Sequence, residues 1–171
     1  MQFNKIIITI VILGIFSAFT GFELCRKSEK NVLNVIEPAI IEVDLNGNKI
    51  FDAGETICIP DIEAFTANIA KNQSELSNSL NLSNDDALKL GYITDEFAES
   101  LLSNKNVKLK FTGKENQNCR YADIFINNQS YKEKLLNSGL GFVNGKPLYN
   151  DTFKKKLSKA RKYNLVILNH K

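Results

Sequence analysis

The alternation of apolar and polar positions predicts that strands dominate the first part of the chain after residue 30. The segment from Val32 to Val43 is apolar and β-branched with polar interruptions, and the segment from Glu55 to Ile59 is short and apolar. The segment from Val107 to Phe111 alternates between apolar and polar residues with a period of two. We therefore expect these three segments to form strands.

Two further segments have the apolar spacing of helices. They run from Glu63 to Asn72 and from Thr94 to Ser103. Thr94 is the expected N-cap of the second helix, and Asp95 and Glu96 place acidic side chains in its first turn. Residues 72–86, which lie between the two helices, are rich in Asn and Ser, so we expect a loop with some helix there.

The last third of the chain continues to alternate between strand and helix. A strand over Ala122–Ile126 is followed by a turn at Asn127–Asn128, and Ser130 to Glu133 has the form of a capping box that opens a helix. Gly139 is the expected end of that helix. We expect Asp151 to cap a last helix that runs to about Tyr163.

The first 27 residues are predicted to be an export signal or an N-terminal membrane anchor rather than part of the fold. Lys5 precedes an apolar run from Ile6 to Phe22, whose 17 residues lie at the lower limit for spanning a bilayer. Both a cleaved signal and a retained membrane tether through residues 6–22 fit this run. We therefore expect a secreted or membrane-anchored protein outside the cytoplasm, with one folded domain over residues 31–171.

Charge is distributed unevenly along the 171 residues. Residues 1–104 contain 7 Lys and Arg against 15 Asp and Glu, whereas residues 105–171 contain 15 against 4. The first part could hold a cation and the second could face a polyanion. The single histidine, His170, excludes mechanisms and metal sites that need paired histidines.

The segment from Asp44 to Glu55 has the spacing of an EF-hand calcium loop, inserted in the domain at residues 44–55. Its expected Ca²⁺ ligands are oxygen atoms of Asp44, Asn46, Asn48, Asp52 and Glu55, and the backbone carbonyl of Ile50. Lys49 occupies the sharp-turn position that normally holds glycine. A polar hairpin turn that binds no metal is the alternative, and we expect affinity in the millimolar range of extracellular modules.

Cys58 and Cys119 are the cysteines of the expected domain, and they lie far apart in the sequence. In an oxidising compartment a disulfide between them is plausible. Two buried free thiols are the alternative.

The region from about Val35 to Leu168 resembles the thermonuclease family, that of staphylococcal nuclease. The similar segments, in order, are Gly91–Phe111, Ala122–Asn128, Leu135–Gly141 and Ala160–Leu168. The resemblance implies an α+β fold, with a five-stranded OB-type β-barrel and about three packed helices. Because the strands that carry the two cysteines would be neighbours in such a barrel, it also favours the disulfide between Cys58 and Cys119.

The same resemblance implies calcium-assisted hydrolysis of DNA or RNA. Glu63 falls on the family's general base, and Asp61 lies one residue from its metal-binding Asp. Arg120 nearly retains the second phosphate-binding Arg, although an ungapped alignment puts Cys119 there. The position of the first phosphate-binding Arg holds Glu55. The family's Asp-Gly-Asp-Thr signature is absent from the first strand.

We expect the chain to be a monomer. Its sequence and the resemblance are consistent with two functions of different classes. The first is an exported nuclease in which Glu63 is the base, Asp61 a metal ligand and Arg120 a phosphate ligand. The second is a catalytically inactive domain, stabilised by calcium, that binds nucleic acid or another polyanion. Both would contact the nucleic-acid backbone through Lys154, Lys155, Lys159, Lys162 and Tyr149. The alternative interpretations are a first-turn carboxylate for Glu63 and a solvated helix face for the lysines.

Overall fold

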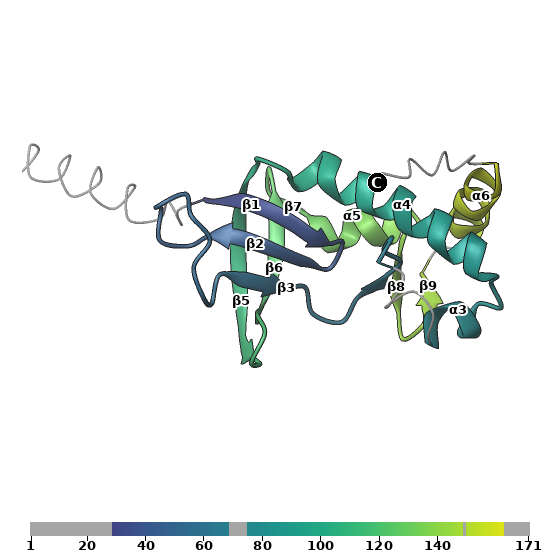
Figure 1. Ribbon diagram of the computed structural model, residues 1–171, viewed down its shortest axis with the longest axis horizontal. Helices are drawn as coiled ribbons and strands as arrows, with labels where there is room; N and C mark the ends of the chain where they lie inside the picture. The colour runs from purple at the N-terminus through teal and green to yellow at the C-terminus, as the bar shows by residue number, and fades with distance from the viewer. Residues whose placement is uncertain (1–28, 69–74, 149, 163–171) are drawn as a thin grey trace, which may run out of the picture.

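The fold is organised around a closed five-stranded β-barrel with mixed strand directions (Figure 1). The computed structural model describes residues 29–68, 75–148 and 150–162. The barrel strands are β1 (Lys30–Glu37), β2 (Ile40–Asp44), β3 (Thr56–Cys58), β5 (Asn106–Glu115) and β6 (Arg120–Ile126). They pair antiparallel in the order β3-β2-β1-β5-β6, and a parallel pairing of β3 with β6 closes the barrel. The expectation of an α+β fold with an OB-like barrel is confirmed at this level.

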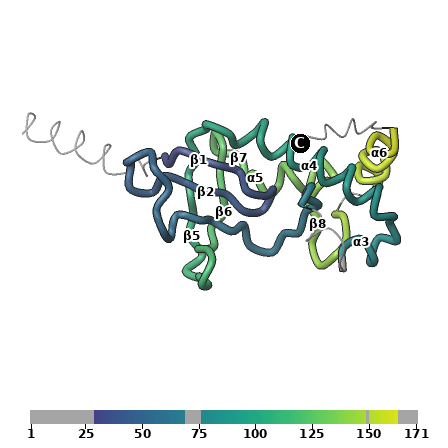
Figure 2. The backbone as a smooth tube through the Cα atoms, in the orientation of Figure 1, coloured from purple at the N-terminus to yellow at the C-terminus, as the bar shows by residue number. Residues whose placement is uncertain are grey.

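Helices and a small second sheet complete the described structure. The helices are α3 (Glu75–Ser79), α4 (Asn84–Leu102), α5 (Tyr131–Asn137) and α6 (Asn150–Arg161). The remaining strands are β4 (Glu63–Ala64), β7 (Gln129–Ser130), β8 (Gly141–Val143) and β9 (Lys146–Pro147), and the second sheet has the order β4-β8-β9. Helix α4 extends from the barrel to α6, and the backbone trace in Figure 2 follows the same course.

The barrel interior is filled by apolar side chains that alternate along the strands. Val32, Ile41, Ile57, Val107 and Ile124 are fully or almost fully buried. Because successive side chains of a strand point to opposite faces, their neighbours in the sequence are left on the outside of the barrel. The period-two pattern therefore decides which residues of β6 can form a surface site.

Helix α4 lies unusually close to the segment that precedes it. A Cβ atom at Gly91 would lie 2.3 Å from the backbone oxygen of Thr66, so only glycine allows this approach. Asp95, one turn further along, accepts hydrogen bonds from the backbone N–H of Ala67 at 2.7 Å and from the Thr66 hydroxyl at 3.2 Å. The contact holds residues 66–67 against the helix.

The start of α4 differs from the sequence prediction. The helix begins at Asn84 after the N-cap Ser83, whose hydroxyl accepts a hydrogen bond from the N–H of Asp86 at 3.1 Å. Thr94 lies in the middle of the helix, where its hydroxyl donates to the carbonyl of Leu90 at 2.7 Å. The prediction that Thr94 caps the helix is therefore wrong, because a threonine inside a helix can bond to the preceding turn instead of capping it.

The predicted helix from Glu63 to Asn72 is also wrong over its described part. Glu63 and Ala64 form β4, and they pair with Phe142 and Gly141 of β8. No helix covers residues 63–68, and residues 69–72 lie outside the described residues. Pairing with a strand distant in the sequence overrides the local helical pattern here.

Predictions for the C-terminal third are mostly confirmed. The turn residues Asn127 and Asn128 have φ angles of 50° and 63°, and the Ser130 hydroxyl caps α5 by accepting a hydrogen bond from the Glu133 N–H at 3.2 Å. The φ angle of Gly139 after α5 is 73°. The prediction that Asp151 caps the last helix is wrong, because α6 begins at Asn150 and Asp151 lies inside its first turn, where a carboxylate favours the helix dipole.

Tyr131 fixes α5 to the barrel. Its side chain is fully buried, and its hydroxyl donates a hydrogen bond to the carbonyl of Pro38 at 2.9 Å. Pro38 lies in the turn that divides the predicted strand region Val32–Val43 into β1 and β2. Burial raises the pKa of the Tyr131 hydroxyl, so the group stays a donor.

The expected signal or anchor of residues 1–27 lies outside the described residues. None of the helices that the structure does describe has the length and apolarity needed to cross a membrane.

Candidate functional site

The loop between β2 and β3 brings the two ends of the expected calcium loop together. Asp44 is the last residue of β2 and Glu55 immediately precedes β3, and the backbone N–H of Val43 donates to the carbonyl of Glu55 at 3.1 Å. Both acidic residues are about 5% exposed. Burying a carboxylate is costly unless hydrogen bonds or a cation compensate for the lost water.

Backbone N–H groups of the loop provide that compensation. Asp44 accepts from Gly47 at 2.6 Å, from Asn48 at 3.1 Å and from Lys49 at 3.0 Å. The Glu55 carboxylate accepts from the N–H groups of three other residues, namely Leu45 at 2.8 Å, Asn46 at 3.3 Å and Asp52 at 3.0 Å. The loop is thereby wrapped around its two terminal carboxylates.

The amide side chains in the loop are turned toward Asp52. The Nδ2 atoms of Asn46 and Asn48 each donate to Asp52 Oδ2 at 2.7 Å. Their Oδ1 atoms accept from backbone N–H groups of Asn48 and Ile50, at 2.9 Å and 2.8 Å. Calcium would need amide oxygens facing it, and rotation of either amide by half a turn exchanges nitrogen for oxygen. Calcium in this loop would therefore require both amides to rotate and to give up the hydrogen bonds that they accept from the N–H groups of Asn48 and Ile50.

Two more observations bear on the metal prediction. Lys49 has a φ angle of 63°, so the sharp-turn position adopts the left-handed conformation that favours glycine although it holds lysine. Asp61 follows the far end of β3, whereas Glu55 precedes its start, so the structure does not bring Asp61 into the loop. Among the described residues no group of three or more His, Cys, Asp or Glu side chains could hold a metal ion, so a cation here depends on amide and carbonyl oxygens as well.

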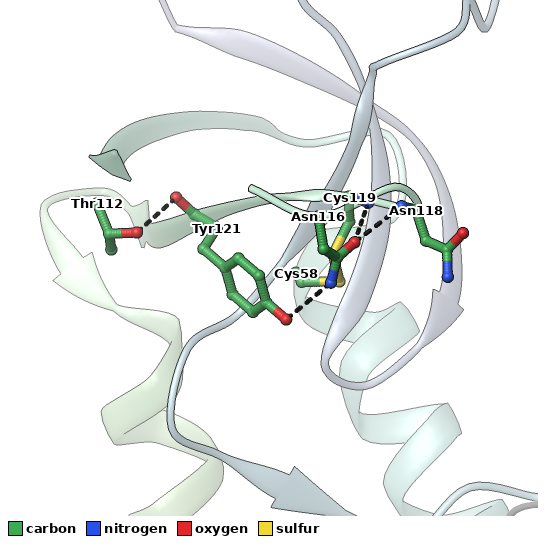
Figure 3. The surroundings of a disulfide bond; sticks show 6 residues. All are labelled: Cys58, Thr112, Asn116, Asn118, Cys119 and Tyr121. Atoms are coloured by element: carbon green, nitrogen blue, oxygen red, sulfur yellow. Dashed lines mark hydrogen bonds between the residues drawn. A yellow bond between two sulfur atoms is a disulfide. The ribbon is translucent and has the colours of Figure 1, made fainter. Parts of the chain in front are cut away.

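A disulfide joins the two strands that close the barrel. Cys58 of β3 is bonded to Cys119, which immediately precedes β6, with their Cα atoms 5.7 Å apart (Figure 3). This is the pairing that the resemblance implied.

The hairpin next to the disulfide is held by Asn116. Its Oδ1 atom accepts hydrogen bonds from the N–H groups of Asn118 at 2.8 Å and Cys119 at 2.9 Å, and its Nδ2 atom donates to the Tyr121 hydroxyl at 3.0 Å (Figure 3). The Thr112 hydroxyl also donates to the carbonyl of Tyr121 at 3.2 Å. These bonds fix the backbone that precedes Arg120.

Arg120 is exposed at the start of β6 and packs on an aromatic ring. The carbon at the centre of its guanidinium lies 4.3 Å from the centre of the Phe111 ring. Phe111 is 41% exposed. A cation over an aromatic face is attracted by the ring quadrupole. The group predicted to bind phosphate is therefore held against the outer part of β5.

Glu63 and Asp61 lie on the segment that leaves the barrel after β3. Both residues are exposed, and Asp61 has a φ angle of 54°. The described contacts do not join Glu63 to Arg120, because Glu63 pairs with β8 while Arg120 pairs with Ile57 of β3. The strand that carries Glu63 thus belongs to the three-stranded sheet, and the strand that carries Arg120 belongs to the barrel sheet.

A lysine that the sequence analysis did not select lies next to this segment. Lys132 of α5 donates a hydrogen bond from Nζ to the carbonyl of Pro60 at 2.8 Å, and its Nζ lies 4.0 Å from Asp61 Oδ2. The sequence gives little reason to select Lys132, because a single lysine in a helix is usually a solvated surface residue. Only the packing of α5 beside the turn after β3 gives it a role.

Helix α6 separates its buried and exposed positions clearly. Phe153 and Ala160 are buried, and Arg161 forms an ion pair with Asp86 of α4 at 2.8 Å. That partner raises the pKa of the Arg161 guanidinium. The predicted nucleic-acid ligands Lys154, Lys155, Lys159 and Lys162 are all exposed. Tyr149, the remaining predicted contact, lies outside the described residues.

The chain was also compared with known proteins. Neither a family model nor a curated protein sequence matches it.

Proposed function

We propose that the chain is a calcium-stabilised, thermonuclease-like domain that binds nucleic acid without hydrolysing it. The observation that carries this proposal is an exposed basic face, called the basic face of α6, which consists of Lys154, Lys155 and Lys159 of α6 and of Lys162 immediately after the helix. Lysines that neutralise phosphates release condensed counterions, which favours binding to DNA or RNA irrespective of sequence. Since α6 is anchored through Phe153, Ala160 and Arg161, this face is presented by a fixed helix.

The barrel supports binding rather than catalysis. Cys119 and Glu55 stand at the two expected phosphate-binding positions, and Arg120 is packed on Phe111. Removing one group that stabilises the charge of a transition state costs about 10²–10³ in rate. A disulfide in place of a cation strengthens the barrel instead, and its formation agrees with the proposed location outside the cytoplasm.

Calcium would be held by the loop from Asp44 to Glu55. Its ligands would be the side chains of Asp44, Asn46, Asn48, Asp52 and Glu55 with the carbonyl of Ile50. Bound there, the ion would offset two buried carboxylates and thereby stabilise the hairpin between β2 and β3. We propose a structural role for it, because the loop and the exposed face of α6 are formed by different elements.

The salt dependence of DNA binding tests the proposal. Replacing the four α6 lysines by Gln should weaken binding to 20-nucleotide single-stranded and duplex DNA, and should reduce the slope of log K against log [salt] by about 3. The matched control replaces Lys105, Lys108, Lys110 and Lys114 by Gln, which changes net charge equally at another place. Equal losses in both variants would contradict a site on α6. Both variants should unfold within about 0.5 kcal/mol of the parent.

Phosphodiester hydrolysis is the second candidate, and one observation favours it. Lys132 places an ammonium group 4.0 Å from Asp61, two residues before Glu63, and could replace a missing phosphate cation. Under this alternative, DNA or RNA is cleaved in calcium, and Glu63→Gln and Lys132→Gln each lower the rate at least about tenfold. Glu99→Gln on α4 is the control variant. Absence of cleavage by the parent protein leaves the binding function.

A further inference from the structure

A cleft of about 560 Å³ lies on the outer side of β6, next to α5. Its lining combines three apolar side chains with five polar ones, namely Phe125, Leu136, Leu148, Asp123, Ser130, Lys132, Glu133 and Asn137. This volume is within the range of sites that bind small molecules. Of its lining residues, only Lys132 was given a role above, in the alternative of phosphodiester hydrolysis, and the proposed nucleic-acid binding uses none of them.

The strand period and the short helix together build this surface. Ala122 and Ile124 point into the barrel, so Asp123 and Phe125 face outward from β6. Glu133 and Leu136 come from α5, which is separated from the end of β6 by four residues. Carboxylates and apolar side chains are thereby placed around one hollow.

Some polar side chains of the cleft have hydrogen-bond or ion-pair partners, and others have none among the described residues. Ser130 is used as the N-cap of α5, and Lys132 donates to the carbonyl of Pro60 and lies near Asp61. No hydrogen bond or ion pair holds the carboxylates of Asp123 and Glu133 within the described part of the chain. Lys110 lies opposite Asp123 in the β5–β6 register but forms no ion pair with it there.

We infer that this cleft binds a protonated amine that is attached to an apolar body. The carboxylates of Asp123 and Glu133 are acceptors for its ammonium hydrogens, and the exposed side chain of Leu148, with Phe125 and Leu136, packs against the apolar part. A phosphate or carboxylate ligand would meet these two like charges, and the one cation of the lining, Lys132, already donates to the carbonyl of Pro60 and lies near Asp61. The site is therefore chemically distinct from the basic face of α6, and it does not depend on the proposed nucleic-acid binding.

Calorimetric titration of the full chain with phenethylamine tests the inference. Phenethylamine should bind at least about tenfold more tightly than its uncharged analogue 2-phenylethanol, because charge-assisted hydrogen bonds are lost in the alcohol. Asp123→Asn and Glu133→Gln should each weaken amine binding about threefold to tenfold while changing side-chain shape little. Asp151→Asn, on α6, is the matched control and should have no effect.

A second variant tests the apolar part without threatening the fold. Leu148 is 57% exposed, so Leu148→Ser should leave the melting temperature nearly unchanged and weaken phenethylamine binding about threefold or more. Equal affinity for the amine and the alcohol, absence of binding by either, or amine binding that none of the cleft variants changes would each overturn the inference.

The ammonium group could belong to a free amine or to a lysine side chain. Titration with acetyl-Leu-Lys-Leu-amide, with the Gln tripeptide as its control, distinguishes these sources. Tighter binding of the lysine peptide than of phenethylamine assigns the cleft to a peptide segment, whereas tighter binding of phenethylamine assigns it to small amines. DNA should compete with neither ligand, since it is proposed to bind elsewhere.

Discussion

The loop from Asp44 to Glu55 and helix α6 use charge in opposite ways. In the loop the carboxylates of Asp44 and Glu55 are buried, and each accepts three backbone hydrogen bonds. On α6 the lysines that define the basic face are exposed, and within the described residues no ion pair holds their ammonium groups. The acidic charge of the loop is hydrogen-bonded within the fold, whereas the basic charge of α6 faces solvent. The two regions should therefore respond differently to substitution.

The largest effect on stability is expected from removing the disulfide that joins the strands closing the barrel. Changing Cys58 and Cys119 to Ala opens a loop closed over a sequence separation of 61 residues, and should lower the free energy of unfolding by about 4 kcal/mol. Urea unfolding measures this change. DNA affinity at α6 should stay within about twofold of the parent under native conditions, and a loss below about 1 kcal/mol would show that the barrel does not depend on the crosslink.

The next effect concerns calcium. At a calcium concentration one hundred times the dissociation constant, the parent protein should gain about 3 kcal/mol in unfolding free energy. Glu55→Gln should abolish most of that gain, because the amide lacks the charge and the bidentate oxygens of the carboxylate. The measurement is the calcium-induced rise in melting temperature, with Glu42→Gln on β2 as the control. A parent that shows no rise would establish the loop as a turn that binds no metal.

A smaller gain is expected at the strained position of the loop. Lys49 has a φ angle of 63°, so Lys49→Gly should raise the unfolding free energy by up to about 1 kcal/mol and tighten calcium binding several-fold. Asn144→Gly is a matched control, since Asn144 has a φ angle of 51° in a turn outside the loop. It should have no effect on calcium affinity. Equal calcium affinities for the parent and Lys49→Gly would contradict the role of this turn.

The smallest effect is a pH dependence at a third carboxylate. Burial raises the pKa of Asp95 above 3.8, and its Oδ1 atom is buried with no hydrogen-bond partner within the described residues. Between 3.8 and the raised pKa the folded state binds more protons than the unfolded state. The unfolding free energy should therefore fall as pH rises through this window. Asp95→Asn should remove this slope, measured as the unfolding free energy against pH, whereas Asp85→Asn should keep it.

Predictions from the sequence succeeded where the structure depends on neighbouring residues and failed where it depends on distant ones. The strands over Val107–Phe111 and Ala122–Ile126 and the Ser130 cap of α5 were predicted from local patterns, and the structure confirms them, although Phe111 is exposed rather than buried. Glu63 shows where a local pattern fails. It pairs with Phe142, which lies about half the length of the domain further along the sequence, and this pairing overrides the helical spacing. The prediction that Thr94 caps a helix fails because α4 starts at Asn84, so Thr94 lies inside the helix and not at its N-terminus.

The site residues divide in the same way. Asp44 and Glu55 lie on one short loop whose spacing is readable from the sequence, and the structure brings them together. Lys132 and the cleft formed by Asp123 and Glu133 have no such spacing, because they depend on how α5 packs beside β6 and the turn after β3. No pattern along the chain encodes that packing directly.

The sequence by itself determined the strand periodicity, the loop spacing, the helix cap at Ser130 and the separation of acidic from basic charge. Each of these is set by interactions over a few residues or by composition. Only the tertiary structure decided that Cys58 meets Cys119, that Arg120 packs on Phe111 and that Asp61 lies beside Lys132. The first and last of these contacts join residues that are distant in the chain and form only when the barrel closes and α5 packs beside it, whereas the contact of Arg120 with Phe111 depends on the pairing of β5 with β6.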